Sequence, residues 1–160
     1  EHHLLPQLTA VENVMLPSIP AGCDSTASKI AHSLLERVGV SHRAEAFPAQ
    51  MSGGERQRTA VARALVNGAR LLLCDEPTGA LDSKAAKELL RLFTHLNQDG
   101  QTILMVTHSV KAASTAGRVL FIKDGKVFHQ IYKGSLSEAQ MYQKISDTMT
   151  AITAGGEDDE

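Results

Sequence analysis

The stretch from Met51 to Asp82 constrains this chain more than any other. It opens with Met51–Glu55, in which Ser52 and two glycines precede an alanine-rich run of helical character. An apolar run without alternation, Leu71–Cys74, follows and leads directly into Asp75-Glu76. Such a run is typical of a parallel strand buried on both faces. The stretch therefore predicts a glycine-containing helix tip and a buried strand with two carboxylates at its carboxyl end.

The bulk composition narrows the possible functions. With 160 residues the chain is long enough for one domain with a hydrophobic core. Its formal net charge of -2 provides no basic field for nucleic acid, so we expect no nucleic-acid partner. No apolar run approaches the roughly 20 residues of a membrane span. Because the sequence begins Glu1-His2-His3 without an initiator Met, we expect it to be an N-terminally truncated fragment.

Helical spacing predicts a small helical subdomain over residues 1–50. The capping-box pattern Thr9–Glu12 starts a helix over about Ala10–Leu16, which should stop before Pro17. Asp24 or Ser25 can cap a second helix, for which Gly39 is the expected C-terminal stop.

Strands and helices alternate in the remainder of the chain. After a helix from Ser52, with Ala60, Val61, Ala64 and Leu65 on its inner face, we expect the strand Leu71–Cys74, a helix Ser83–Asn97, a strand Thr102–Thr107, a short helix Val110–Ala116, and a hairpin of Arg118–Ile122 and Val127–Tyr132 around Asp124-Gly125. This order predicts a three-layer α/β domain with a mostly parallel sheet.

The C-terminal part is predicted as a helix over 135–154. A capping box at Ser135–Glu138 leads it, and one face carries Tyr142, Ile145, Met149 and Ile152. Residues 155–160 are predicted to be an acidic, disordered tail.

Asp75 and Glu76 are the central candidates for chemistry. Ligands of open parallel sheets bind beyond the carboxyl ends of the strands, and two adjacent acids there need a cation or a shared proton. We expect Asp75 to serve Mg²⁺ that also binds nucleotide phosphates, and Glu76 to orient or deprotonate the attacking water. The alternative is a solvated acidic loop.

Ser52-Gly53-Gly54-Glu55 predicts a phosphate-binding helix N-terminus. Glycines let the backbone approach a ligand, the first amides of a helix are free, and the dipole favours an anion. The alternative is a capping box alone, since Ser-x-x-Glu is its pattern.

Two further residues complete the candidate site. His108 follows the second apolar strand, where it can hold a terminal phosphate and the attacking water together, or can be an ordinary structural histidine. Asp82 is placed to reach across an interface or to cap the next helix.

One half of a phosphate site is missing. The loop Gly-x-x-x-x-Gly-Lys-[Ser/Thr] that cradles nucleotide phosphates is absent, because the only Gly-Lys pair, Gly125-Lys126, is followed by Val127 in a hairpin turn.

Taken together, these motifs resemble the nucleotide-binding domain of ABC transporters over about Leu4–Gly134. Met51–Glu55 resembles the signature loop, Leu71–Glu76 the Walker B strand, Gly79–Asp82 the D-loop, and His108 the switch histidine. Leu4–Val14 resembles the segment after the Q-loop glutamine. The Ser-Gly-Gly-Glu-Arg-Gln-Arg form is similar to ATPases for antimicrobial-peptide resistance, macrolide efflux or lipoprotein release.

The resemblance implies a P-loop NTPase fold without its Walker A strand, whose absence leaves sheet edges exposed. It implies that Ser52, Gly53, Gly54 and Glu55 contact ATP held by a second ATP-binding domain, in a homodimer. Asp75, Glu76 and His108 would serve ATP and Mg²⁺ on their own side. Residues 1–50 would dock an integral-membrane permease, and 51–134 would form the signature and Walker B part of the core.

The expected function is ATP hydrolysis coupled to export, at the cytoplasmic face of the cell membrane. The 160-residue chain alone is expected to be inactive, because Walker A is absent. Two alternatives are open: a non-transport ABC ATPase, and a half that lends its signature loop to a partner without hydrolysing ATP.

Overall fold

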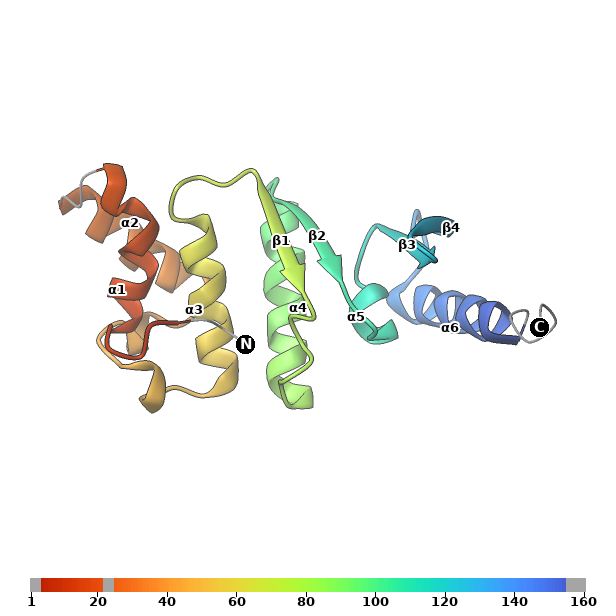
Figure 1. The fold of residues 1–160 in the computed structure, drawn as a ribbon, viewed down its shortest axis with the longest axis horizontal. Helices are drawn as coiled ribbons and strands as arrows, with labels where there is room; N and C mark the ends of the chain where they lie inside the picture. The colour runs from red at the N-terminus through yellow and green to blue at the C-terminus, as the bar shows by residue number, and fades with distance from the viewer. Residues whose placement is uncertain (1–3, 22–24, 155–160) are drawn as a thin grey trace. The chain divides into compact units, whose positions relative to one another are not determined.

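The structure is a computed structural model that describes residues 4–21 and 25–154 (Figure 1). It comprises two compact units, Glu1–Leu104 and Met105–Glu160, and each is described by itself. Helices and strands occur together in the order that the sequence predicts, so the mixed α/β class is confirmed. The predicted tail at 155–160 lies outside the described residues.

Helix α1 (Ala10–Met15) begins at the predicted capping box. The amide of Glu12 donates to the Thr9 hydroxyl at 3.4 Å, and the amide of Thr9 donates to the Glu12 carboxylate at 2.7 Å. The α-helix ends before Pro17, and the chain continues as the 3₁₀ helix η1 (Leu16–Ala21). Asn13 is fully buried and ties α1 to the preceding loop by donating to the carbonyl of Leu5 at 3.1 Å.

Helix α2 (Ser25–Arg37) ends where glycine was predicted to stop it. Gly39 has φ 72°, a left-handed conformation that glycine adopts without strain. The amide of Val40 then donates to the carbonyl of Leu35 at 2.8 Å, which closes the helix end. The other predicted cap, Asp24, lies outside the described residues. Two 3₁₀ helices, η2 (Ser41–Arg43) and η3 (Pro48–Gln50), lead on to the next helix.

Helix α3 (Gly53–Leu65) is the centre of the first unit, since α1, α2 and α4 all pack against it. Its buried stripe differs from the predicted one. Ala64 is exposed, whereas Thr59, Val61, Ala62 and Leu65 are buried. The stripe is rotated because α3 is covered from several sides, and apolar spacing alone does not reveal which neighbours will cover it.

Strand β1 (Leu71–Asp75), helix α4 (Ser83–Gln98) and strand β2 (Thr102–Val106) follow one another along the chain. The two strands are hydrogen-bonded neighbours in a two-stranded sheet, joined through α4. One face of α4 is buried, at Leu89, Leu90, Phe93 and Leu96.

The prediction that the strand Leu71–Cys74 is buried on both faces is wrong for the described residues. In β1 only Leu72 is buried, while Leu71 is 48% and Leu73 is 67% exposed. In β2 Leu104 and Val106 are likewise exposed. A continuous apolar run indicates that both faces need cover, but the residues at 4–21 and 25–154 supply cover for one face only. They form two separate two-stranded sheets in place of one mostly parallel sheet.

The N-terminal ends of α3 and α4 meet at a glycine. A Cβ atom added to Gly54 would lie 3.0 Å from the Cβ atom of Ala85, which is closer than ordinary van der Waals contact. One added to Gly53 would lie 3.5 Å from Leu81 Cδ2, an ordinary contact distance. Helix packing therefore favours glycine at position 54, a reason that the sequence pattern did not reveal.

The second unit contains the predicted hairpin. Strands β3 (Arg118–Lys123) and β4 (Lys126–Tyr132) pair antiparallel. Asp124 and Gly125 form the turn with φ 52° and 72°, as a two-residue turn with left-handed conformations at both positions requires. The pairing of the two strands is irregular between Phe121 and Ile122 in β3.

Helices α5 (Val110–Ala113) and α6 (Glu138–Ala154) complete the second unit, whose core contains Ile131, Met141 and Ile145. The predicted start and face of α6 need correction. The amide of Gln140 donates to the Ser137 hydroxyl, so the cap begins at Ser137 and not at Ser135. Tyr142 and Met149 are exposed. No helix among the described residues is both long and apolar enough to cross a membrane.

We predict that Gly54→Ala destabilises the protein relative to Gly53→Ala. Both changes raise helix propensity, but only the methyl group at Gly54 meets Ala85 too closely. Overpacking of this kind costs about 1–3 kcal/mol, so we expect Gly54→Ala to be less stable than Gly53→Ala by roughly 1 kcal/mol in urea unfolding.

A double-mutant cycle with Ala85→Gly tests the cause. In the Ala85→Gly background the methyl group at position 54 has room, so its cost should shrink or disappear. An equal cost in both backgrounds would contradict the α3–α4 contact as the reason for Gly54.

Candidate functional site

The N-terminal tip of α3, residues Ser52–Glu55, is built by a capping box. The amide of Glu55 donates to the Ser52 hydroxyl at 3.2 Å, and the amide of Ser52 donates to the Glu55 carboxylate at 2.7 Å. The capping alternative is therefore confirmed as local geometry. Ser52 is nevertheless exposed, so its hydroxyl lies at the protein surface.

The carboxylate of Glu55 is held from a second side by residues that sequence reasoning did not assign to the site. Arg43 Nε donates to Glu55 Oε1 at 3.0 Å, and His42 Nε2 lies 3.2 Å from the same oxygen. The side chain of Glu55 is only 12% exposed. Arg43 and His42 lie 12 and 13 residues before Glu55, so no local spacing pattern could have indicated the contact.

These partners change the acidity of Glu55. The backbone amide of Ser52, with Arg43, the Ser52 hydroxyl and His42 in addition, lowers the pKa of Glu55 from 4.5 to about 2, although burial opposes the shift. The carboxylate at the α3 tip therefore stays ionised in the folded protein at every physiological pH.

Asp75 and Glu76 lie at the carboxyl end of β1, where the sequence placed them. Asp75 is the last residue of the strand and is exposed. Glu76 follows with φ 40°, a left-handed conformation that costs a non-glycine residue about 1–3 kcal/mol. The turn after it is closed by the amide of Gly79, which donates to the Glu76 carbonyl at 3.1 Å. The fold thus holds Glu76 in a strained conformation.

Asp82 is the N-cap of α4. Its carboxylate accepts hydrogen bonds from the amides of Lys84 at 2.9 Å and Ala85 at 2.8 Å. The capping alternative for Asp82 is therefore confirmed, and contact across an interface stays a prediction.

The first unit brings the α3 tip and the Gly79–Asp82 segment together. Leu81 lies against Gly53, and Ala85 lies against Gly54, so two helix N-termini are neighbours. Each end carries a partial positive charge, which the carboxylates of Glu55 and Asp82 offset. The first-turn amides of Gly53 and Gly54 have no acceptor within α3.

His108 lies in the second unit, two residues after the end of β2 and just before Ser109, the N-cap of α5. Its side chain is exposed. That His108 and Glu76 act on the same phosphate stays a prediction.

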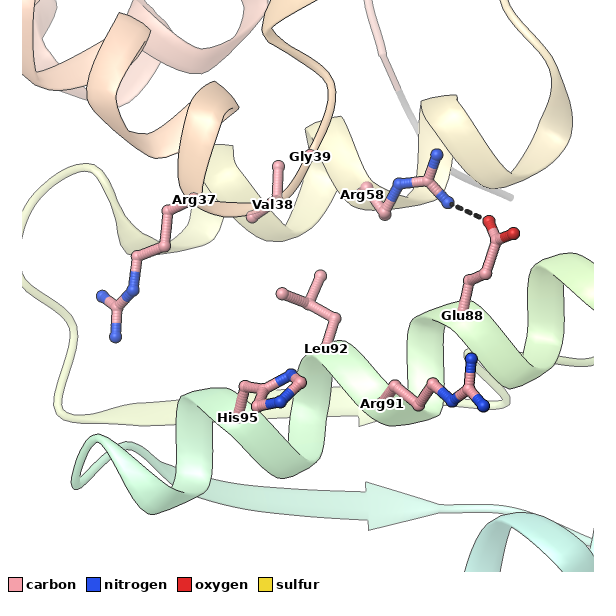
Figure 2. A pocket seen from close by; sticks show the side chains of 8 residues that line it. All are labelled: Arg37, Val38, Gly39, Arg58, Glu88, Arg91, Leu92 and His95. Carbon is pink, nitrogen blue, oxygen red and sulfur yellow. Dashed lines mark hydrogen bonds and ion pairs between the residues drawn. The ribbon is translucent and has the colours of Figure 1, made fainter.

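A pocket of about 320 Å³ lies elsewhere in the first unit, among α2, α3 and α4 (Figure 2). It is lined by Arg37, Val38, Gly39, Arg58, Glu88, Arg91, Leu92 and His95. Two of its cations are already paired, Arg58 with Glu88 at 3.2 Å and Arg37 with Asp99 at 2.7 Å. None of the predicted site residues lines it.

Asp75 fits a metal that takes most of its ligands from a nucleotide. Among residues 4–21 and 25–154, no group of three or more His, Cys, Asp or Glu side chains could hold a metal ion. Mg²⁺ commonly binds one or two carboxylates together with substrate phosphates, and the exposed carboxylate of Asp75 suits that arrangement.

The lowered pKa of Glu55 predicts an acid-dependent loss of stability. The folded carboxylate stays charged while the unfolded one is protonated below pH 4.5, so its contribution is present above that pH and is lost as the pH falls towards about 2. The measurement is the free energy of unfolding in urea at pH 7 and at pH 3. Between these two pH values we expect it to fall by roughly 1–2 kcal/mol less in Glu55→Gln than in the unmodified protein.

The matched control is Glu88→Gln, which removes a carboxylate that also pairs with an arginine but is 44% exposed, against 12% for Glu55. Its loss between pH 7 and pH 3 should equal that of the unmodified protein. An equal pH dependence for the Glu55→Gln protein would contradict the assignment.

Comparison with known proteins supports the resemblance. The family model described as "ABC transporter" matches residues 1–79. The macrolide export ATP-binding/permease protein MacB of Bartonella quintana is 47% identical over 127 residues, which cover 79% of this chain and 19% of MacB. The ABC transporter ATP-binding protein YvrO of Bacillus subtilis is 47% identical over 126 residues, covering 78% of this chain and 55% of YvrO.

Solved structures agree with the sequence relatives. The ATP-binding cassette MJ0796, in a dimeric post-hydrolysis state bound to ADP and Pi, matches with a TM-score of 0.70 and 39% identity over 82% of this chain and 59% of its own. A second dimeric structure of MJ0796 also has a TM-score of 0.70, with 40% identity.

The chain spans about a fifth of the length of the MacB relatives and just over half of YvrO. Within that span, the family model, the sequence relatives and the solved cassettes all point to one family. The chain belongs to the ABC transporter family and forms part of its ATP-binding domain.

Proposed function

We propose that this chain forms the signature-loop and Walker B part of an ATPase that drives export through a membrane permease. The observation that carries the proposal is the α3 tip. There Ser52, the exposed N-cap of α3, precedes the glycines that lie beside the N-terminus of α4. The free first amides of a helix can bind a nucleotide phosphate, and the glycines let it approach closely.

The α3 tip would contact ATP held mainly by a second ATP-binding domain. The Ser52 hydroxyl accepts the amide of Glu55, and its own hydrogen could turn from the Glu55 carboxylate to an anion. The first-turn amides of Gly53 and Gly54 have no acceptor within the helix. Glu55 would act through its hold on Ser52. The dimeric MJ0796 cassette supports a homodimeric arrangement.

Residues beyond β1 would serve the ATP on their own side. Asp75 would hold Mg²⁺, which when bound neutralises charge on the transferred phosphoryl group. Glu76 would orient and deprotonate the attacking water, and its strained backbone suits a residue that must be aimed. His108 would hold the terminal phosphate and that water together. Asp82 would meet donor groups of the second domain.

The names of the relatives support the proposed partners. MacB proteins and the probable syringafactin export protein SyfD are named as ATP-binding/permease proteins. We infer that residues 9–47 dock a permease at the cytoplasmic face of the membrane, and that residues 51–134 form the core segment. The exported substrate would be a peptide, drug or lipoprotein-like molecule.

Two other functions are weighed against this one. A non-transport ABC ATPase of the chromosome type would need a long coiled coil between its half-sites, whereas the described residues before α3 form short helices, of which α1 and α2 pack on α3. A non-hydrolysing half-site has no need for Asp75, Glu76 and His108 together. Measuring ATP turnover distinguishes the second alternative.

We predict that Glu76→Gln abolishes ATP turnover but preserves ATP binding. The test uses a chimaera in which the N-terminal portion of YvrO, ending at its Q-loop, precedes this chain. Binding survives because Asp75 and the phosphate loop remain, while activation of water is lost; we expect kcat to fall at least about a hundredfold. Asp99→Asn, at an exposed surface pair, is the control. Full turnover by the Glu76→Gln chimaera would overturn the role of Glu76.

The 160-residue chain by itself should show no measurable ATPase activity. It has no Gly-x-x-x-x-Gly-Lys-[Ser/Thr] loop, so nothing in it cradles the nucleotide phosphates. The measurement is phosphate release by the purified chain, with the chimaera as positive control. Turnover that depends on Glu76 in the isolated chain would mean that a phosphate loop of another kind is present.

A further inference from the structure

We propose that Arg43 is a positioning residue for the α3 tip: by holding the Glu55 carboxylate, which binds the Ser52 amide, it fixes the Ser52 backbone and with it the direction of the Ser52 hydroxyl. The inference rests on the proposed function, in which the α3 tip contacts ATP. It assigns a role in nucleotide binding to a residue that lies outside every motif in the sequence.

The contacts form a continuous chain. Arg43 Nε donates to Glu55 Oε1 at 3.0 Å, the other carboxylate oxygen accepts the Ser52 amide at 2.7 Å, and the Glu55 amide donates to the Ser52 hydroxyl at 3.2 Å. Rotation of the Glu55 side chain would release the Ser52 amide from the carboxylate, whereas the backbone amide of Glu55 could still donate to the Ser52 hydroxyl.

The position of Arg43 is itself well defined. It is the last residue of η2, where the amide of Arg43 donates to the carbonyl of Val40 at 2.9 Å. Val40 is fully buried, and Ala44 is buried on the other side of Arg43. The guanidinium is therefore attached to a fixed backbone, which is what a positioning residue needs.

A purely structural salt bridge is the alternative. Arg37 provides the comparison, because it pairs with Asp99 at 2.7 Å in the same unit but touches no part of the α3 tip. Its side chain is 44% exposed and that of Arg43 is 43% exposed, so the two ion pairs are matched in solvent screening on the arginine side. They differ in what the carboxylate does next: Asp99 caps nothing at the candidate site, whereas Glu55 caps Ser52.

The test compares Arg43→Met and Arg37→Met in the YvrO chimaera. Methionine keeps an aliphatic stem and removes the donor. Without nucleotide, we expect amide hydrogen exchange at Ser52 and Glu55 to accelerate in Arg43→Met and to stay unchanged in Arg37→Met. With ATP, kcat/KM should fall by about fivefold to tenfold in Arg43→Met, as the loss of a charge-assisted hydrogen bond implies, and by less than about twofold in Arg37→Met. Thermal unfolding shows that both variants are folded.

Two further variants separate the possible outcomes. Glu55→Gln removes the charge that Arg43 holds, so adding Arg43→Met to it should cost little more than Glu55→Gln alone. Arg43→Lys keeps a donor and should recover part of kcat/KM. Unchanged exchange and unchanged kcat/KM in Arg43→Met would overturn the proposal, as would fully additive losses with Glu55→Gln.

Failure of the underlying function gives a different result. If exchange at Ser52 accelerates in Arg43→Met but Ser52→Ala and Arg43→Met both leave kcat/KM unchanged, the contact with Glu55 exists and the α3 tip does not serve ATP. That outcome would overturn the proposed function, and with it the nucleotide-related role of Arg43.

Discussion

The reciprocal hydrogen bonds between Ser52 and Glu55 are the constraint on which the first unit depends. They provide acceptors for the backbone amides of both residues at the start of α3. Helices α1, α2 and α4 pack against α3. Loss of an N-cap lowers the stability of a helix by about 1 kcal/mol. A less stable α3 would also weaken the packing of the helices that contact it. Fold and candidate function therefore depend on the same two residues.

Close packing places the N-terminal ends of α3 and α4 beside each other. Because Gly54 has no side chain, the N-terminus of α4 can approach that of α3, with Ala85 in contact. Two parallel dipoles that begin side by side repel each other at their positive ends. The ionised Glu55 and the capping Asp82 offset this repulsion.

Local chemistry was predictable from the sequence, and tertiary cover was not. The caps at Thr9, Ser52 and Asp82 and the turn at Asp124 depend on residues within three positions of one another, so short patterns found them. The exposure of Leu73, the choice of Met141 over Tyr142 in the second unit, and the Arg43–Glu55 pair depend on which distant segments meet. The roles of Glu76 and His108 need a bound nucleotide, which sequence spacing cannot place.

Ser52 can cap α3 and bind an anionic ligand at the same time. Asp82 can cap α4, but it cannot also bind an anion. A serine hydroxyl accepts one hydrogen bond and still donates its own proton, so the oxygen that caps α3 can bind a phosphate at the same time. A carboxylate only accepts, so Asp82 would be repelled by the phosphate that Ser52 attracts. The two neighbouring caps would therefore have separate tasks: Ser52 faces the anion, and Asp82 faces donors from another chain. The difference follows from the number of protons that each side chain carries.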